Sequence, residues 1–355
     1  MRIAQIAPLH EAVPPKLYGG TERVVSFLTE ELVNLGHDVT LFASGDSVTS
    51  AELHPCWPRA LRLDPAIRDP IAPHMLMMEQ VARRLDQFDV LHFHMDYWPF
   101  THFSRETVPF VTTMHGRLDL GELQPVFDAF SDIPVVSISD AQRRPLPQAH
   151  FVRTVHHGLP ANLLTPQGAA DGSDRSYLAF LGRICPEKGV DKAIRISRAV
   201  GIPLRIAAKV DKVDVDYFDQ VIRPMLGDGV ELIGEINDSQ KPAFLSGARG
   251  LLMPIDWPEP FGLVMIESMA CGTPVIAFNR GSVPEIVEDG LTGLVVEDET
   301  SAIGAISRLN GFSPARIRQR FEERFTARRM AEDYLSVYRE LAHAKRPSLR
   351  LVGSD

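Results

Sequence analysis

The sequence has few cysteines and no excess of basic residues, and these two shortages exclude several classes of protein. Its 355 residues include three cysteines, Cys56, Cys185 and Cys271, which lie far apart and form no C-x-x-C pair. That distribution disfavours a disulfide scaffold and a cysteine-rich zinc site, and it is typical of a reducing compartment. Lys and Arg number 37 against 46 Asp and Glu, which gives a net charge of −9. This acidic balance argues against a chain that binds nucleic acid.

Long hydrophobic runs are also absent. No stretch approaches the ~18 consecutive apolar residues that indicate a membrane-spanning helix, so we expect no membrane span. The first residues, MRIAQIAPLH, lack the cationic lead and apolar core of a secretory signal peptide. We therefore expect a cytoplasmic protein. A chain of this length corresponds to roughly two domains of ~150 residues each.

Two nucleotide-binding motifs and the common metal motifs are missing as well. Neither half carries G-x-G-x-x-G after its first strand, and no G-x-x-x-x-G-K-[ST] is present, which disfavours a dinucleotide dehydrogenase or a P-loop enzyme. The histidines have no H-E-x-x-H motif or Cys/His set beside them, so we expect neither a metal site nor a cofactor. Asp214-Val215-Asp216 resembles a D-x-D metal motif, but we interpret it as the cap of a predicted helix.

What the chain does have is a hydrophobic period that alternates between strand and helix. A strand over 2–8, a helix over 21–35 and a strand over 38–43 form the first such unit. Strands apolar on both faces, alternating with helices, predict doubly wound α/β architecture with parallel sheets. Further strands are expected at 90–94, 110–115, 134–139, 177–182, 204–210, 230–236, 251–255, 274–279 and 293–297.

A change in composition predicts where the chain divides. Residues 165–176, TPQGAADGSDRS, are small and polar, and we interpret them as a linker. We expect an N-terminal Rossmann-like domain over 1–168 and a C-terminal Rossmann-like domain over 169–325, with 326–355 completing the first. One long closing helix is expected from Pro314 to Ala342. Doubly wound sheets bind ligands at the carboxyl ends of their strands, so we expect the two domains to face each other across a cleft.

Two charged motifs lie where helices are expected to begin. G-R-I-C-P-E-K-G, which starts at Gly182, carries two cations, Arg183 and Lys188, that suit a diphosphate. An ordinary strand-to-helix loop with surface charges fits this motif equally well. In W-P-E-P-F-G-L-V-M-I-E, Glu259 suits sugar hydroxyls and Glu267 suits a ribose diol. The alternative for Glu267, inside an apolar helix, is a buried salt bridge.

These motifs, with A-C-G-T-P-V-I-A and G-S-V-P-E-I-V, resemble the retaining nucleotide-sugar glycosyltransferases of family 4, enzymes of the GT-B fold related to glycogen and sucrose synthases. The match is dense from Tyr177 to Val296 and looser in the N-terminal half. There, Gly19-Gly20-Thr21-Glu22, His92-Phe93-His94 and Met114-His115-Gly116 resemble landmarks of the family. The order of these motifs along nearly the whole chain is highly specific.

The resemblance assigns roles to the matching positions. Arg183 and Lys188 would hold the donor diphosphate, Glu259 the hydroxyls of the donor sugar, and Glu267 the ribose. Gly20 and its neighbour Gly19 would approach the diphosphate from the other domain, and His115 would lie beside the reacting sugar. His94 and Asp96, at a strand end, are candidate acceptor contacts, although simple hydrogen bonding explains them as well. The remaining donor-site residues implied are Gly182, Glu235, Ile236, Gly262, Leu263 and Val264.

The sequence therefore predicts a retaining hexosyltransferase that uses a nucleotide sugar, with a UDP-sugar preferred. The leaving diphosphate would assist front-face transfer to an acceptor hydroxyl, without a metal, while fixed cations stabilise its growing charge. The acceptor (a small molecule, a glycan or a lipid) is left open, as are the oligomeric state and peripheral contact with a membrane. Two alternatives stay open: an epimerase or hydrolase acting on nucleotide sugars on the same fold, and a two-lobed sugar-binding protein without catalysis.

Overall fold

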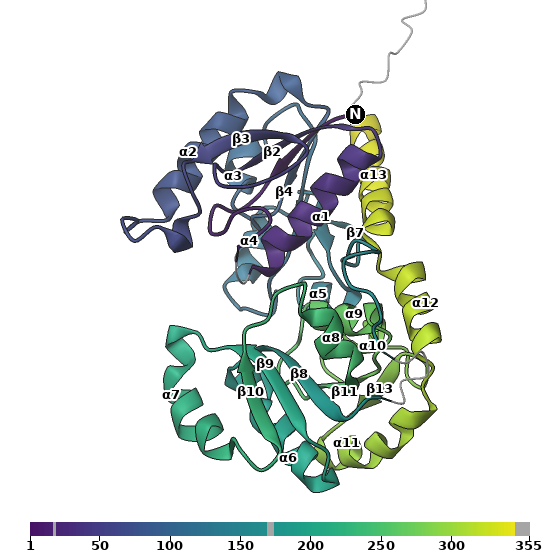
Figure 1. Cartoon of the computed structure of the whole chain (residues 1–355). Helices are drawn as coiled ribbons and strands as arrows, with labels where there is room; N and C mark the ends of the chain where they lie inside the picture. The colour runs from purple at the N-terminus through teal and green to yellow at the C-terminus, as the bar shows by residue number, and fades with distance from the viewer. Residues whose placement is uncertain (17–18, 169–173, 345–355) are drawn as a thin grey trace, which may run out of the picture. The chain divides into compact units, whose positions relative to one another are not determined.

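The computed structural model describes residues 1–16, 19–168 and 174–344 (Figure 1). Part of the expected linker, 169–173, and the last residues, 345–355, lie outside the described residues. The chain divides into two compact units. The first unit comprises Met1–Ile138, Pro145–Val155 and the chain from Arg328 onward, and the second unit comprises Ser139–Arg144 and His156–Ala327. Residues 156–168, expected at the end of the N-terminal domain, therefore pack within the second unit.

The first unit is built on a parallel sheet in the order β3-β2-β1-β4-β5-β6-β7. Its inner strands are buried on both faces, as their apolar sequences predict. The edge strands β3 and β7 were not predicted, because they are only partly buried and β3 contains a proline, so neither shows a clear apolar pattern. The strands are β1 (Arg2–Ile6), β2 (Asp38–Ser44), β3 (Glu52–Trp57), β4 (Val90–Phe93), β5 (Phe110–Thr113), β6 (Val135–Ser137) and β7 (Phe151–Thr154).

Helices cover this sheet and bury a core rich in phenylalanine. Helix α1, predicted over 21–35, is confirmed, and it buries Val24, Val25, Leu28 and Leu32. Figure 1 shows α13 alongside α1, and Arg328 of α13 lies 3.6 Å from Glu31 of α1. The helices of this unit are α1 (Gly20–Asn34), α2 (Ile71–Ala82), α3 (Phe100–Phe103), α4 (Leu123–Ala129) and α13 (Ala327–Ala344), with single 3₁₀ turns at Leu61–Leu63 and Leu85–Gln87.

The second unit contains a parallel sheet in the order β10-β9-β8-β11-β12-β13. The strands are β8 (Tyr177–Arg183), β9 (Leu204–Lys209), β10 (Val230–Gly234), β11 (Ala248–Met253), β12 (Val275–Phe278) and β13 (Gly293–Val296). The helices are α5 (Asp140–Arg143), α6 (Val190–Val200), α7 (Val215–Tyr217), α8 (Lys241–Ser246), α9 (Leu263–Ala270), α10 (Val283–Ile286), α11 (Glu299–Ile306) and α12 (Pro314–Arg324), with 3₁₀ turns at Pro186–Lys188, Lys212–Asp214 and Ser307–Gly311. The two sheets confirm the predicted doubly wound α/β class.

Two helical predictions need correction. The helix predicted to begin at Asp214-Val215-Asp216 is short α7 followed by a π turn, Phe218–Ile222, and a 3₁₀ turn, Arg223–Met225. Pro224 has no amide hydrogen for the α-helical ladder. The single closing helix is also wrong, since it breaks between α12 and α13. There the Leu159 amide donates to the Phe325 carbonyl at 2.9 Å, and the Ala327 amide donates to the Leu159 carbonyl at 2.8 Å. These bonds to Leu159 take the place of the helical bonds.

In both sheets the strand order reverses beside the first strand. β1 lies between β2 and β4, and β8 lies between β9 and β11. Connections leave such a pair of strands in opposite directions, which opens a crevice at their carboxyl ends. The residues that follow β1 and β4 in the first unit, and β8 and β11 in the second, are therefore the candidates for ligand binding.

Candidate functional site

The second unit gathers three polar side chains where β8 and β11 end. Lys188 Nζ lies 2.5 Å from Glu259 Oε2, and Trp257 Nε1 donates to the same carboxylate oxygen at 2.9 Å. The Lys188 ammonium also lies 4.6 Å from the centroid of the Trp257 ring, a cation–π contact. Glu259 is buried and Lys188 half-buried. The structure thus brings together two residues from separate sequence motifs, and it adds Trp257, which was not among the expected site residues.

The backbone fixes the two loops that carry this cluster. Gly189 has a φ of +70°, and a Cβ there would collide with the Pro254 carbonyl, so only glycine permits this approach. The Asp256 amide donates to the Glu187 carbonyl at 2.9 Å, which joins the loops directly. Behind them, the Ser282 amide donates to the Glu259 carbonyl at 2.9 Å. Lys188 and Glu259 are therefore presented by loops that are fixed on both sides.

Arg183 lies at the end of β8, but its partners are acids that follow β9. Its Nη1 is 3.4 Å from Asp211 Oδ2, and its Nε is 4.0 Å from Asp214 Oδ2. Burial alone would raise the pKa of Asp211, but hydrogen bonds from Lys209 and Arg183 lower it. Asp214 is the N-cap residue of α7, as the sequence indicated, but its side chain makes no capping hydrogen bond. Its carboxylate faces Arg183 instead.

Glu267 forms the buried salt bridge that the sequence left open as an alternative. Its Oε1 lies 2.6 Å from Lys241 Nζ of α8, and Lys241 also lies 3.1 Å from Asp238. Pairing of this kind offsets the cost of burying the carboxylate. A role of Glu267 in holding ribose stays a prediction.

The other expected donor-site residues lie at strand or helix ends. Exposed Glu235 and half-buried Ile236 follow β10, the edge strand of the sheet. Gly262 has a φ of +81° and precedes α9, with Leu263 and Val264 in its first turn. The amides of a first helical turn have no partner within the helix, so they are available to a ligand oxygen. Gly182, in β8, precedes Arg183.

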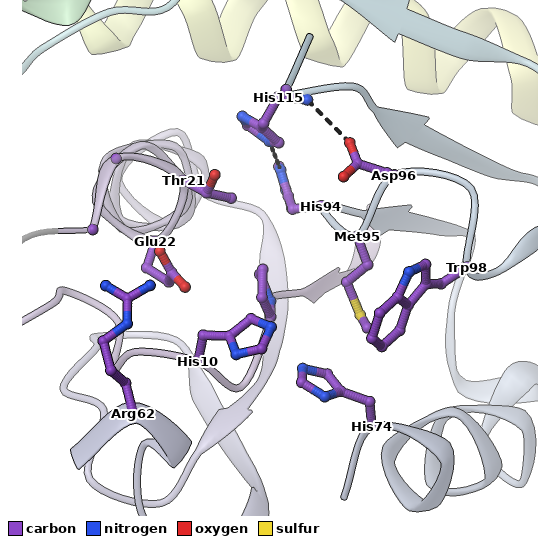
Figure 2. Close-up of a pocket in the computed structure, with 14 residues that line it drawn as sticks. His10, Thr21, Glu22, Arg62, His74, His94, Met95, Asp96, Trp98 and His115 are labelled. Atoms are coloured by element: carbon purple, nitrogen blue, oxygen red, sulfur yellow. Dashed lines mark hydrogen bonds between the residues drawn. The ribbon is translucent and has the colours of Figure 1, made fainter. Parts of the chain in front are cut away.

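In the first unit, a pocket of about 360 Å³ opens where β1, β4 and β5 end and α1 begins (Figure 2). It contains all three expected acceptor residues, His94, Asp96 and His115, together with Gly19 and Gly20. The remaining lining residues are Pro8, His10, Thr21, Glu22, Arg62, His74, Met95, Trp98 and Gly116.

A chain of hydrogen bonds fixes the histidines at the back of this pocket. His94 Nδ1 lies 2.9 Å from His115 Nε2, and His94 Nε2 lies 2.8 Å from Gln5 Oε1. The Gln5 amide donates in turn to the Tyr338 hydroxyl at 3.0 Å. Because the Gln5 oxygen can only accept, His94 carries its proton on Nε2 and accepts on Nδ1 from His115 Nε2–H. Burial lowers the pKa of His115 to about 3, so its ring is neutral at neutral pH.

Figure 2 shows the Asp96 carboxyl beside His115, joined to its backbone amide. Its Oδ1 accepts from the His115 amide at 3.4 Å, and its backbone has a φ of +50°, which is uncommon for a residue other than glycine. The Thr112 hydroxyl donates to the Asp96 carbonyl at 2.8 Å and holds this conformation. Burial raises the pKa of Asp96 to about 6, although the bond from His115 opposes the shift. Its carboxyl can therefore exchange a proton near neutral pH.

A carboxylate and an aromatic wall face the open part of the pocket. Burial raises the pKa of Glu22, in the first turn of α1. Opposite, the His74 and Trp98 rings meet edge to face at 5.0 Å, and burial lowers the pKa of His74. Of these residues only Glu22 belonged to a recognised motif, and none was expected in the site. For Glu22 the usable signal was its place in the helix that follows the first strand.

Among the described residues, no group of three or more His, Cys, Asp and Glu side chains could hold a metal ion. Within the same part of the chain, no helix is long and apolar enough to cross a membrane.

Comparison with known families places these features in context. The chain matches the sequence model described as Glycosyltransferase Family 4 over residues 18–201, more than half of its length. It also matches the model described as Glycosyl transferases group 1 over residues 166–312. The two matches overlap and together cover most of both units.

Individual relatives agree with this assignment. Alpha-maltose-1-phosphate synthase of Mycobacterium tuberculosis (strain CDC 1551) is 27% identical over 58% of this chain and 63% of its own length. The chain thus spans less than two thirds of the length of this relative. Sucrose-phosphate synthase of Thermosynechococcus elongatus has a similar structure, with a TM-score of 0.79 at 22% identity over 97% of this chain and 99% of that one. HepE of Anabaena, solved in complex with UDP and glucose, has a TM-score of 0.73 at 17% identity over 96% of this chain and all 100% of that one. At these identities the solved structures support the GT-B fold alone.

Proposed function

The chain belongs to glycosyltransferase family 4, and on this premise we propose that it moves a hexosyl group from a nucleotide sugar to an acceptor hydroxyl, with retention of configuration. The observation that carries the proposal is the cluster of Lys188, Glu259 and Trp257 at the strand reversal of the second sheet. A cation and a carboxylate, fixed at the position where sheets of this kind bind ligands, suit the charged and the hydroxylated ends of a sugar diphosphate.

In this proposal Lys188 exchanges its partner when the donor binds. Its ammonium leaves the Glu259 carboxylate for a diphosphate oxygen, and Glu259 then accepts hydrogen bonds from hydroxyls of the donor sugar. Arg183, the last residue of β8, adds a second cation. As the bond from the sugar to the diphosphate breaks, negative charge grows on the leaving oxygen, and cations already in place stabilise that state more than the ground state.

The leaving diphosphate would also take the proton of the acceptor hydroxyl on the face from which it departs. This front-face route needs no protein nucleophile, and Glu259 is occupied with positioning. It also needs no metal, because Arg183 and Lys188 supply the positive charge. UDP is the preferred carrier, a choice supported by the UDP complex of the structurally similar HepE. The acceptor would bind in the first-unit pocket, with its reacting hydroxyl close to Asp96 and His115. The three free, buried cysteines fit the cytoplasmic location that we propose.

A panel of donors tests the proposal. The protein is incubated with UDP-, GDP- and ADP-glucose, nucleoside diphosphate release is measured, and thermal stability is followed with each free diphosphate. We expect one diphosphate, UDP, to raise the melting temperature, and the matching sugar nucleotide to release it faster when a suitable acceptor is present. If none of the diphosphates stabilises the protein, the proposal is wrong. Conversion of the donor to an epimer, without transfer, would favour the epimerase alternative.

A further inference from the structure

We infer that the first-unit pocket takes a polyhydroxy acceptor without negative charge, that is, a sugar and not a sugar phosphate. This inference rests on the proposed function, because it names the acceptor class of the proposed transferase. It is carried by the charges that line the pocket and by the surface between them.

The charges that line the pocket are mostly negative. Glu22 and Asp96 contribute two carboxyl groups, and Arg62 is the one cation among the lining residues, all of which the structure describes. Arg62 is bound in turn to an acid, since its Nη1 lies 3.0 Å from Glu11 Oε1, and Glu11 is almost fully buried. Burial lowers the pKa values of His10, and of His115 to about 3, so neither ring supplies a positive charge at neutral pH.

The start of α1, a second place where an anion could bind, already faces a carboxylate. Gly19 precedes α1 without a side-chain cap, and the first amides of a helix attract negative charge. The Glu22 carboxylate accepts hydrogen bonds from the backbone amides of Glu22 and Glu11. Only 6% of Glu22 is exposed, and Figure 2 shows it beside Arg62 at this edge of the pocket. A phosphate on the acceptor would meet the Glu22 carboxylate here, in addition to the donor diphosphate that Gly19 and Gly20 are expected to approach.

The same surface suits sugar hydroxyls and the apolar face of a sugar ring. The Glu22 carboxyl lies on the α1 side of the pocket and the Asp96 carboxyl lies across from it, and both can accept hydrogen bonds from hydroxyl groups. On the same side as Asp96, Trp98, which is 40% exposed, stands against His74 and Met95. His74 is held in one tautomer, because the Leu9 amide donates to its Nε2 at 3.0 Å and its Nδ1 lies 2.6 Å from the Pro70 carbonyl. The wall is therefore preformed and partly open to a ligand.

Matched pairs of acceptors test this inference. Glucose is compared with glucose 1-phosphate, and inositol with inositol 3-phosphate, at equal concentrations and with the same donor. Binding is followed by saturation-transfer NMR, and transfer by mass spectrometry of the product. We expect the uncharged member of at least one pair to bind, with kcat/KM at least ~10²-fold above that of its phosphate, because like charges oppose the latter. Equal or better use of either phosphate overturns the inference, and so does the failure of both uncharged members to bind.

Variants of the pocket locate the selectivity. Glu22→Gln removes one negative charge. It should reduce the preference for the uncharged acceptor over its phosphate by about tenfold. Asp96→Asn should also narrow the preference for the uncharged acceptor, measured by binding. This variant provides the test if Glu22→Gln does not fold. Glu79→Gln, on the exposed face of α2, is the matched control and should leave the preference unchanged. A preference that is unaffected in both pocket variants contradicts the inference.

Failure of the proposed function has a different signature. UDP binding is measured on the same samples by its stabilisation of the protein. If no nucleoside diphosphate binds, the proposed transferase is wrong whatever the pocket accepts. If UDP binds and the phosphorylated acceptor is the one used, the transferase stands and the inference about its acceptor is wrong.

Discussion

At the scale of single residues, the candidate donor site depends on a lysine that already has a partner. Lys188 is held by Glu259 and by the Trp257 ring, so its ammonium is positioned before any ligand arrives. Once donor binding has moved the ammonium from Glu259 to the diphosphate, this cation is in place before the bond to the sugar breaks. The contact with Lys188 compensates the carboxylate of Glu259, which is buried. A substitution of Lys188 or of Glu259 should therefore remove one charge and also release the side chain of the other residue from its contact.

Lys188→Ala should lower turnover at least ~10²-fold, because the leaving diphosphate loses a fixed cation. The measurement is steady-state release of nucleoside diphosphate with saturating donor. Arg249→Ala is the control, since Arg249 lies at the amino end of β11, away from the site. Turnover near that of the unmodified protein would place the diphosphate site elsewhere.

Glu259→Gln should abolish most transfer while largely keeping UDP binding, since this residue is proposed to contact the sugar and not the nucleotide. Both quantities can be obtained from one preparation, by product analysis and by calorimetric titration with UDP. Glu231→Gln, at an exposed position of β10, serves as the control. A variant that loses UDP binding and transfer together would contradict the assignment of Glu259 to the sugar.

Asp96 should make the stability of the protein depend on pH. Because burial raises its pKa to about 6 in the folded state, the folded protein holds this proton over a range in which the unfolded chain, with a pKa near ~3.9, has lost it. The contribution of Asp96 to the free energy of unfolding therefore falls as the pH rises from about 4 to 6, by at most ~3 kcal/mol.

The Asp96→Asn variant cannot titrate, so its stability relative to the unmodified protein should increase over that interval. Urea unfolding at pH 4.5 and pH 7 measures the difference. Asp128→Asn, at an exposed position of α4, serves as the control. If the free energies of unfolding of Asp96→Asn and the unmodified protein differ by the same amount at both pH values, the pKa of the Asp96 carboxyl is not raised.

At the scale of elements, the C-terminal helix is joined to the first sheet by polar as well as apolar contacts. Tyr338 of α13 is fully buried, and its hydroxyl lies 2.6 Å from His92 Nδ1 and accepts from Gln5. Tyr334 of the same helix lies 2.9 Å from the Thr113 hydroxyl. Since Gln5 also bonds to His94, this helix supports the histidine chain that ends at His115.

Tyr338→Phe should therefore reduce the free energy of unfolding by about 2 kcal/mol, because Gln5 and His92 lose a buried hydrogen-bond partner. Chemical denaturation measures the loss. Tyr97→Phe, at an exposed position, should cost far less. Equal effects of the two substitutions would contradict a role for the buried hydroxyl.

Sequence patterns predicted the inner elements well and the edges poorly. Buried parallel strands such as β8, and α1 with its regular apolar face, carry strong periodic signals. The break between α12 and α13 carries none, because it depends on Leu159, a residue far away in the sequence. The candidate site divides in the same way. The contact of Lys188 with Glu259 agrees with two recognisable motifs, whereas His74 and Trp98 meet only through the tertiary packing of the first unit.

At the scale of the whole molecule, the two units repeat one plan with different chemistry. Each has a parallel sheet whose strand order reverses beside its first strand, and each gathers polar residues at that reversal. The second unit offers cations for a diphosphate, whereas the first offers carboxyls and an aromatic wall. The net charge of −9 is therefore no obstacle to binding an anionic donor, because the cations that matter are local to one loop of the second unit.

The central claim is that the loops after β8 and β11 bind a nucleoside diphosphate through Lys188. Calorimetric titration of UDP into the unmodified protein and into Lys188→Ala tests it most directly. The account predicts saturable binding to the unmodified protein and affinity at least ~10-fold weaker for the variant, because a charge-assisted contact is lost. Equal affinity for the two proteins, or no binding of UDP, GDP or ADP to the unmodified protein, would contradict it.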